Sequence, residues 1–450
     1  MLSKEDNDTI CRVGPGTPMG DVMRQYWVPA LAASELPAPD CAPVRVKLLG
    51  EELIAFRDVA GRVGLLGNHC PHRGASLFFG RNEQAGLRCV YHGWKFDVTG
   101  ACVDMPNEPP ESNFKSKVRA TAYPCRERGG VIWAYMGPRS SPPSLPDIEP
   151  NMLPDGDYTV GVTMRSCNWL QGLEGDIDTS HLQILHQGSM KPEDVRPGTM
   201  AFYGLADRAP RYQVVDVPGG TMYGAYRPAG DSAYYWRIAL FLFPFYSLIP
   251  TGLLGHQVQV RAWVPMDDEH MMFFSMAKRG AGSAPPRADG GGQLRATTPD
   301  GRTPRGGLRY HPNGTGWYDR FRLVQDLDND YLIDRAQQRS NGSFTGIAGI
   351  PVQDAAATEG MGAIADRSQE HLVSSDAMII RTRRRLLEAA RALRERGQAP
   401  PGVDEPEVYS VRSGGVILPR DADWIAATAD LRKAFIDHPG LDLSIVGDDS

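Results

Sequence analysis

Two short segments of the sequence each place a cysteine just before a histidine. Cys70 and His72 form the first pair, Cys89 and His92 form the second, and sixteen residues separate the pairs. Two thiolates and two imidazoles can bind a tetrahedral zinc ion, but zinc fingers pair cysteine with cysteine and histidine with histidine. Here each pair is mixed. This pattern suits a [2Fe–2S] cluster in which one iron takes both thiolates and the other takes both imidazoles.

Glycines follow both pairs, at Gly74 and Gly93. A glycine lets backbone N–H groups come close to the sulfides of a cluster, and such hydrogen bonds tune its reduction potential. A structural zinc site is the alternative interpretation of the same four residues. His69 is the one additional histidine in this region, and the Cys-x-His spacing assigns the ligand role to His72 instead.

A second group of possible metal ligands lies between residues 167 and 186, a stretch that the pattern predicts to be largely helical. Asp178 and His181 are three residues apart and share one face of a helix. His181 and His186 are five apart, which turns them about 140° from each other on a regular α-helix. Both can reach one ion only at a helix end or a π-type turn, and such irregularities are common at functional sites. The alternative is a pair of surface histidines on an amphipathic helix.

Two imidazoles and one carboxylate on a single face of an iron ion leave positions open for dioxygen and substrate. Asp178 lies too close in sequence to His181 to be the obvious carboxylate ligand. The third ligand is therefore expected from another part of the chain.

Segments 68–74 and 89–94 resemble the Rieske motif of ring-hydroxylating oxygenases. Segments 14–34, 167–186 and 349–376 are similar to the phthalate-dioxygenase-like branch of that family, so the resemblance extends over nearly the whole chain. It implies an oxygenase subunit that needs no small β-subunit.

The resemblance also implies roles for individual residues. Asp178 is expected to link His181 to a cluster histidine of a neighbouring subunit, so that electrons cross a subunit boundary. The carboxylate ligand is expected from segment 349–362, with Asp354 favoured and Glu359 as the alternative. Asn168 is expected to form a hydrogen bond near the iron. The implied assembly is a trimer or two stacked trimers.

The sequence predicts an α+β protein in two main domains. Short strands separated by turns, such as 44–48 and 131–135, predict an antiparallel β-domain that carries the cluster loops. The resemblance implies a START-like helix-grip catalytic domain with an antiparallel sheet. The expected divisions are an N-terminal lead at 1–34, a Rieske domain at 35–140, a proline-rich linker at 141–155 and a catalytic domain at 156–450.

Within the catalytic domain, runs of apolar and aromatic residues predict strands at 212–215, 221–226, 234–241 and 257–263. Helices are expected at 318–338 and 377–396, and the tail after residue 411 is expected to be irregular. Residues 279–307 are rich in Gly, Pro, Ala and Arg, which predicts an exposed, mobile excursion.

The composition narrows the function classes. The chain has 450 residues, a net charge of −6 and no basic block, so we expect neither nucleic acid nor a membrane surface as a partner. No run of eighteen apolar residues occurs, and the polar N-terminus is unlike a signal peptide. Seven cysteines without paired spacing favour a reducing cytoplasm over a disulfide framework.

The phthalate-dioxygenase-like branch acts on aromatic carboxylates and aryl ethers. An anionic substrate needs a fixed cation in its pocket, and arginine holds a carboxylate through two hydrogen bonds. We expect Arg211 and Arg237 in this role, with Arg208 and Arg227 as substitutes. Surface salt bridges are the alternative role for these side chains.

The expected function is therefore that of a terminal oxygenase. A reductase with flavin and an iron–sulfur centre would carry electrons from NAD(P)H to the cluster, and Fe(II) with O2 would cis-dihydroxylate a phthalate- or isophthalate-like aromatic acid. One alternative is a monooxygenase that O-demethylates a methoxybenzoate. Another is an electron carrier with a ligand-binding domain and no catalytic iron. Three irons per chain would indicate the oxygenase and two would indicate the carrier.

Overall fold

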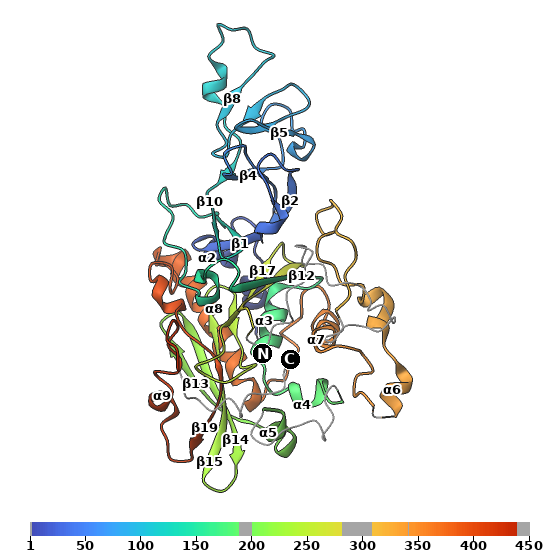
Figure 1. The fold of residues 1–450 in the computed structure, drawn as a ribbon, viewed down its shortest axis with the longest axis vertical. Coiled ribbons are helices and arrows are strands. Elements are labelled where there is room, and N and C mark those ends of the chain that lie inside the picture. The colour runs from blue at the N-terminus through green and yellow to red at the C-terminus, as the bar shows by residue number, and fades with distance from the viewer. Residues whose placement is uncertain (1, 189–199, 281–307, 341, 439–450) are drawn as a thin grey trace.

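The computed structural model describes residues 2–188, 200–280, 308–340 and 342–438. A narrow part built from small β-sheets projects along the longest axis of the molecule from a broader part that holds a large sheet and most of the helices (Figure 1). The chain is thus an α+β protein, in which a part built from small antiparallel sheets is followed by a part with helices and a large antiparallel sheet. Most of the expected excursion at 279–307 lies outside the described residues.

Three small antiparallel sheets make up the narrow part and its base. The first has the order β2-β3-β4-β9, with β2 at Val44–Leu48, β3 at Glu51–Arg57, β4 at Val63–Gly67 and β9 at Ala122–Tyr123. The second has the order β5-β6-β7-β8, with β5 at Arg81–Glu83, β6 at Gly86–Arg88, β7 at Lys95–Phe96 and β8 at Cys102–Asp104. The third joins β1 at Trp27–Ala32, β11 at Val131–Tyr135 and β10 at Cys125–Arg128.

The cores of these sheets follow from the alternation of the sequence. Val46 and Leu48 of β2 are buried, whereas Arg45 and Lys47 between and beside them are half-buried, because successive side chains of a strand point to opposite faces. A separate apolar cluster around Phe56 and Phe96 packs under the metal-binding loops and includes both cysteines, Cys70 and Cys89.

An eight-stranded antiparallel sheet forms the centre of the broad part. Its order is β12-β18-β17-β16-β15-β14-β13, and β19 pairs with β15. The strands are β12 at Tyr158–Arg165, β13 at Arg211–Val217, β14 at Gly220–Ala229, β15 at Ala233–Leu242, β16 at Tyr246–Leu248, β17 at Gln259–Pro265, β18 at Met271–Lys278 and β19 at Gly414–Pro419.

The α-helices of the described residues surround this sheet. They are α1 at Lys4–Cys11, α2 at Pro18–Arg24, α3 at Trp169–Ile177, α4 at Leu182–Leu185, α5 at Met200–Ala206, α6 at Arg335–Arg339, α7 at Ile350–Glu359, α8 at Ala377–Arg396 and α9 at Trp424–Ala427. The long helix α8 packs its apolar face against β13 and β14, as a helix-grip arrangement requires, and ends at Gly397 in a left-handed conformation. No helix in the described ranges is both long and apolar enough to cross a membrane.

Two expectations about secondary structure were wrong. The helix expected at 318–338 is replaced by a short 3-10 segment at Leu327–Leu332 and the one-turn helix α6, because Asp330, Tyr331 and Leu332 all adopt positive φ angles that end a right-handed helix. The tail after residue 411 is not irregular throughout, since β19 completes the sheet beside β15 and α9 follows it.

Candidate functional site

The two cluster loops have the same backbone design. In each loop the carbonyl of the cysteine accepts a hydrogen bond from a glycine four residues later, at 2.9 Å from Gly74 to Cys70 and 3.0 Å from Gly93 to Cys89. Both glycines have positive φ angles, +75° and +80°, which glycine adopts without steric cost. The sequence therefore builds two matching turns, and each presents one thiol and one imidazole.

The four cluster residues lie as two pairs. Both cysteine side chains are buried, and the His72 and His92 rings lie edge to face with centroids 4.4 Å apart. Nδ1 of His92 is buried and has no hydrogen bond partner among the described residues, which suits a ligand atom. Burial raises the pKa of the Cys70 thiol to about 11, and the neighbouring Cys89 adds to the shift, so a thiolate here needs metal ions beside it.

His69, which the sequence spacing excluded from the ligand set, is engaged in the loop itself. Its Nδ1 lies 3.0 Å from the carbonyl oxygen of Gly74. The residues present thus fit a [2Fe–2S] cluster held by one thiol and one imidazole from each loop.

The second metal centre forms where α3 ends. The helix stops at Ile177, and Asp178 leaves it in an extended conformation. His181 and His186 then flank the single turn of α4, one at each end, and their rings lie 5.2 Å apart. The spacing of five residues between His181 and His186 predicted an irregular helix geometry, and the structure shows it as a helix end followed by one isolated turn.

Helix α7 brings a carboxylate to these two histidines. The Oδ1 atom of Asp354 lies 3.2 Å from Nε2 of His186 and 3.6 Å from Nε2 of His181. Among the described residues these three are the one group of three or more possible ligands whose atoms all lie within 4.8 Å of one another. Two imidazoles and a carboxylate on one face are the donor set of a non-heme iron centre.

Each histidine also has a partner on its other ring nitrogen. Nδ1 of His181 lies 3.4 Å from Oδ2 of Asp178, whose other oxygen accepts hydrogen bonds from the backbone and hydroxyl of Ser180. Nδ1 of His186 lies 2.7 Å from Oε1 of Gln353. These contacts leave both Nε2 atoms directed toward Asp354.

The charges of the site follow from burial and from these pairs. Burial works against charge on His181, but the hydrogen bond to Asp178 and the charge of Asp354 outweigh it, so the pKa of His181 is raised. Burial raises the pKa of Asp354, but His186, His181 and Arg165 outweigh it and the net shift is downward. The carboxylate of Asp354 is therefore ionised and suited to bind a cation.

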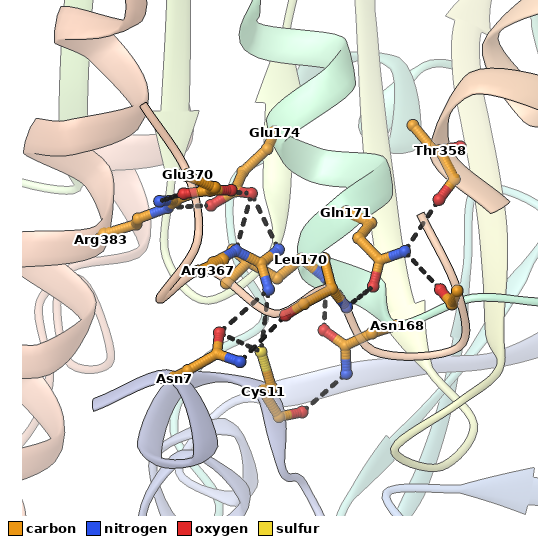
Figure 2. Close-up of polar contacts among 12 residues, drawn as sticks. Asn7, Cys11, Asn168, Leu170, Gln171, Glu174, Thr358, Arg367, Glu370 and Arg383 are labelled. Carbon is orange, nitrogen blue, oxygen red and sulfur yellow. Dashed lines mark hydrogen bonds and ion pairs between the residues drawn. The ribbon is translucent and has the colours of Figure 1, made fainter. Parts of the chain in front are cut away.

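Buried polar contacts fix α3 relative to its neighbours (Figure 2). Glu174 of α3 accepts hydrogen bonds from Arg367 and from Arg383 of α8, and Arg367 also reaches Asn7 of α1. Gln171 of α3 donates to backbone carbonyls at the end of α7, at 2.8 Å. The helix that leads to the histidines and the helix that carries Asp354 are thus joined directly.

Two predicted site residues are placed elsewhere. Asn168 lies at the start of α3, where its side chain caps the helix and donates to the carbonyls of Cys11 and Asp268. The helix has nine residues, so Asn168 is about 13 Å from its other end and from Asp178. Glu359 is buried in an ion pair with Arg165 at 2.7 Å, which takes it away from the histidines.

The predicted arginines divide between the two faces of the sheet. Arg237 lies opposite Ala225, and Arg227 is two residues beyond Ala225 on β14, so the two arginines share a face. Arg211 lies opposite Tyr226, which puts it on the other face. It is exposed and pairs with Asp207, and Arg208 is also exposed. The structure therefore replaces Arg211 by Arg227 as the neighbour of Arg237.

Arg227 and Arg237 are both buried and incompletely paired. Nη2 of Arg227 and Nη1 of Arg237 have no hydrogen bond partner among the described residues. Burial lowers the pKa of Arg227 to about 10, and the charge of Arg237 contributes to this shift. Nε of Arg237 donates to the hydroxyl of Thr179 at 2.7 Å, and Thr179 lies between Asp178 and the iron-site histidines. A cationic site thus adjoins the second metal centre.

Comparison with known proteins matches both parts of the chain. Residues 26–123 match the Rieske [2Fe-2S] domain and residues 134–442 match the LigXa C-terminal domain like family. The chain is 47% identical to the 3-chlorobenzoate-3,4-dioxygenase oxygenase subunit of Comamonas testosteroni, over 95% of this chain and 98% of that protein. It is 38% identical to the phthalate 4,5-dioxygenase oxygenase subunit of Pseudomonas putida, over 94% of each chain.

The chain belongs to the phthalate-dioxygenase-like Rieske oxygenases.

The fold of this Rieske oxygenase also resembles that of a solved structure. Dicamba monooxygenase bound to dicamba gives a TM-score of 0.55 at 19% identity, with 83% of this chain and 99% of that chain covered. At this identity the likeness concerns the fold alone.

Membership in the family fixes the cofactors. The oxygenase uses a [2Fe–2S] cluster and a mononuclear iron, together with O2 and electrons that a reductase supplies. The two groups of residues described above fit these cofactors in number and in kind.

Two residues of the site were missed by sequence reasoning. Thr179 and Gln353 have no distinctive spacing, although each is adjacent to a predicted residue, Asp178 and Asp354 respectively. No sequence signal marks their roles, because these depend on contacts with Arg237 and His186, which lie far away in the chain.

Proposed function

We propose that this oxygenase inserts both atoms of O2 at adjacent carbons of an aromatic ring that carries a carboxylate, such as phthalate, isophthalate or a substituted benzoate. The observation that carries the proposal is the pair of buried arginines, Arg227 and Arg237, each with an unpaired nitrogen. The relatives named above act on a chlorobenzoate and on phthalate, which supports the same substrate class.

Physical chemistry favours an anion between the two arginines. Two buried cations that lack full hydrogen bonding are costly, because they repel each other and have lost their water. A carboxylate relieves both costs, since it offers two oxygens to the planar guanidinium groups. The carboxylate of the substrate therefore supplies the negative counter-charge for the two arginines.

The same pair orients the ring toward the iron site. Arg237 is tied to Thr179, two residues before His181, so a carboxylate bound to Arg237 is held close to the chain segment that carries the histidines. A ring positioned by its carboxylate presents a fixed edge, and the arginines therefore select which carbons are oxidised.

We assign the cluster to Cys70, His72, Cys89 and His92 and the mononuclear iron to His181, His186 and Asp354. When bound, the iron activates O2 for attack on the ring. His181, His186 and Asp354 would hold the iron, and a set of three protein ligands would leave it able to bind O2. The overall reaction consumes one O2, two electrons and two protons and yields a cis-diol that contains both oxygen atoms.

We further propose that electrons reach the iron site from the cluster of a neighbouring subunit through Asp178. Within one chain, the cluster loops lie in the narrow part and α4 lies in the broad part, well separated along the longest axis (Figure 1). The Asp178 carboxylate contacts His181 and keeps about a fifth of its side chain exposed, which leaves room for a group from another subunit. A head-to-tail trimer, or two stacked trimers, meets this requirement.

The experiment supplies the full-length enzyme with a reductase system, 18O2 and a panel of phthalate, isophthalate, terephthalate, 3-chlorobenzoate and methoxybenzoates. The proposal expects a cis-diol that carries two 18O atoms from at least one aromatic acid. Release of formaldehyde from a methoxybenzoate, with one 18O in the water, would instead assign an O-demethylase. Absence of both products with every acid would contradict the substrate class.

The arginine assignment has its own test. Arg227→Met and Arg237→Met should each raise KM for the aromatic acid about ten- to a hundredfold, because a hydrogen bond to a charged group contributes about 1.5–3 kcal/mol. Iron content should stay unchanged in both. The matched control is Arg211→Met on the opposite face, which should leave KM as it is. Equal effects from all three substitutions would remove the arginines from the site.

A further inference from the structure

A buried glutamine contacts one of the two iron-site histidines. Gln353 precedes Asp354 on α7 and is only 1% exposed. Its Oε1 lies 2.7 Å from Nδ1 of His186, and its Nε2 donates to the carbonyl of Ile347 at 2.8 Å. Both ends of the side-chain amide are therefore engaged.

The contact with Ile347 decides which way the amide faces. A backbone carbonyl only accepts hydrogen bonds, so the NH2 group of Gln353 must face Ile347 and the oxygen must face His186. An amide oxygen only accepts, so Nδ1 of His186 must carry the proton. The lone pair of the neutral ring is then on Nε2, the atom that lies 3.2 Å from Asp354.

We propose that Gln353 is the positioning residue of His186: it fixes the tautomer and the ring orientation in which Nε2 binds iron. The inference rests on the proposed ligand role of His186 and extends it to a residue that binds no metal itself. Hydrogen bond partners of metal-bound histidines commonly act in this way.

The chemistry of the partner distinguishes the two histidines. His181 faces the carboxylate of Asp178, whereas His186 faces a neutral amide. The site already contains two carboxylates, Asp178 and Asp354, beside the two histidines. A neutral acceptor at position 353 orients the ring without adding a third negative charge to the site.

Helix α7 couples this role to that of the carboxylate ligand. Gln353 and Asp354 are consecutive, so any rotation of α7 moves the ligand and the partner of His186 together. The helix begins after Gly349, which has φ +92°, and its first turn contains Pro351. The rigid start of the helix thus sets two of the contacts that define the iron site.

The test compares two substitutions in the full-length protein with its cluster present. Gln353→Met keeps the length of the side chain and removes both hydrogen bonds, whereas Gln353→Glu keeps an oxygen acceptor for His186. Fe(II) affinity is measured by competition with a chelator, and the iron environment is measured from the EPR spectrum after addition of nitric oxide. Gln257→Met is the matched control, since Gln257 is a buried glutamine whose hydrogen bonds join it to Thr251, Gly252, Ile249 and Ser413 and to none of the metal ligands.

We expect Gln353→Met to weaken Fe(II) binding about ten- to a hundredfold, and Gln353→Glu to stay within about threefold of the natural protein. The EPR spectrum of the Glu variant should nevertheless change, because the partner of His186 now differs in charge. Gln257→Met should alter neither quantity.

Three outcomes would overturn the proposal: unchanged Fe(II) affinity in Gln353→Met, an equal loss in Gln257→Met, or an unchanged EPR spectrum in Gln353→Glu. The last measurement remains decisive if the Met variant fails to fold. Failure of the underlying ligand assignment is distinguishable, because His186→Ala would then retain Fe(II).

Discussion

Asp178 is the residue at which the proposed electron path meets the iron site. Its Oδ1 accepts two hydrogen bonds from Ser180, and its Oδ2 faces His181. Burial raises the pKa of Asp178, but His181 and Ser180 outweigh it, so the net shift is downward and the carboxylate is ionised near neutral pH. Oδ1 therefore fixes the position of the Asp178 side chain, and Oδ2 interacts with His181.

Asp178→Asn should keep both metal centres and nearly abolish turnover. Asparagine has the same shape and can still accept from Ser180, but its neutral amide is a weaker hydrogen bond acceptor than the carboxylate that faces His181. The measurement is iron content together with the rate at which a pre-reduced cluster is oxidised by O2 and substrate. Full turnover in this variant would exclude Asp178 from the path.

Arg227 should give the proposed substrate site a characteristic pH dependence. Because burial and Arg237 lower its pKa to about 10, this arginine is charged below that pH and loses its charge above it. Binding of an aromatic carboxylate should therefore be constant from neutral pH to about 9 and weaken as pH rises through about 10. Equilibrium binding to the natural protein and to Arg227→Met checks this, since the variant should lack the fall.

The residue scale also shows what spacing alone predicts. The four proposed cluster ligands follow from spacing, because the mixed Cys–His pairs are themselves the signal, and the structure places them on two matching loops. Arg211 was not separable from Arg227 in the sequence, because one residue of register reverses the face of a strand. Gln353 was beyond reach, since its role depends on a contact with His186, which lies 167 positions away.

At the scale of elements, α3 is the part that positions the iron ligands, and Glu174 anchors it. The carboxylate is buried between Arg367 and Arg383, at 2.8 Å and 2.5 Å. Burial raises the pKa of Glu174, but the two arginines outweigh this and lower it. The stabilisation is thus present above the pKa of the unfolded chain and is lost as pH falls through the lower pKa of the folded state.

Glu174→Gln should lower the free energy of unfolding by about 3–5 kcal/mol, because it leaves the buried Arg367 without its counter-charge, whereas Arg383 keeps its pair with Glu370. Glu388→Gln is the control, since Glu388 pairs with Arg384 on an exposed turn of α8 and should change stability by less than about 0.5 kcal/mol. Denaturant unfolding of both variants decides the comparison. Equal losses would show that the buried network is not the anchor.

Helices could be predicted from the sequence where the local hydrophobic pattern determines the structure. The expected bounds of α8 are those observed, because a continuous amphipathic stripe ends at a glycine. The helix expected at 318–338 had charges and an apolar stripe as well, but the left-handed run at Asp330, Tyr331 and Leu332 interrupts it. Tyr331 is buried against Glu359, so a tertiary contact overrides the local pattern there.

At the scale of the whole molecule, the surface beside the cluster suggests that another chain covers it. Val90 and Tyr91, next to His92, are 57% and 54% exposed. Exposed apolar side chains that lie together on a surface are typical of a contact with another protein. The separation of the two candidate metal sites within one chain supports the proposal that the electron passes to a neighbouring subunit.

Mixed oligomers test this arrangement directly. One variant, Asp354→Ala, should lose the mononuclear iron and keep the cluster. The second, His72→Ala, should lose the cluster and keep the iron. Each alone should be inactive, but co-expressed chains that assemble together should place an intact cluster beside an intact iron site of the next subunit.

The expected activity of a random one-to-one mixture is about a quarter of the natural value, because each interface needs an intact donor and an intact acceptor, each with a chance of about one half. Product formation in the unfractionated mixture gives this fraction, whereas purified, doubly tagged mixed trimers should give about a third, because each mixed trimer has one competent interface of three. Transfer within a single chain predicts no activity in the mixture at all, because no chain then has both centres. The mixture therefore separates the two electron paths without any change to Asp178.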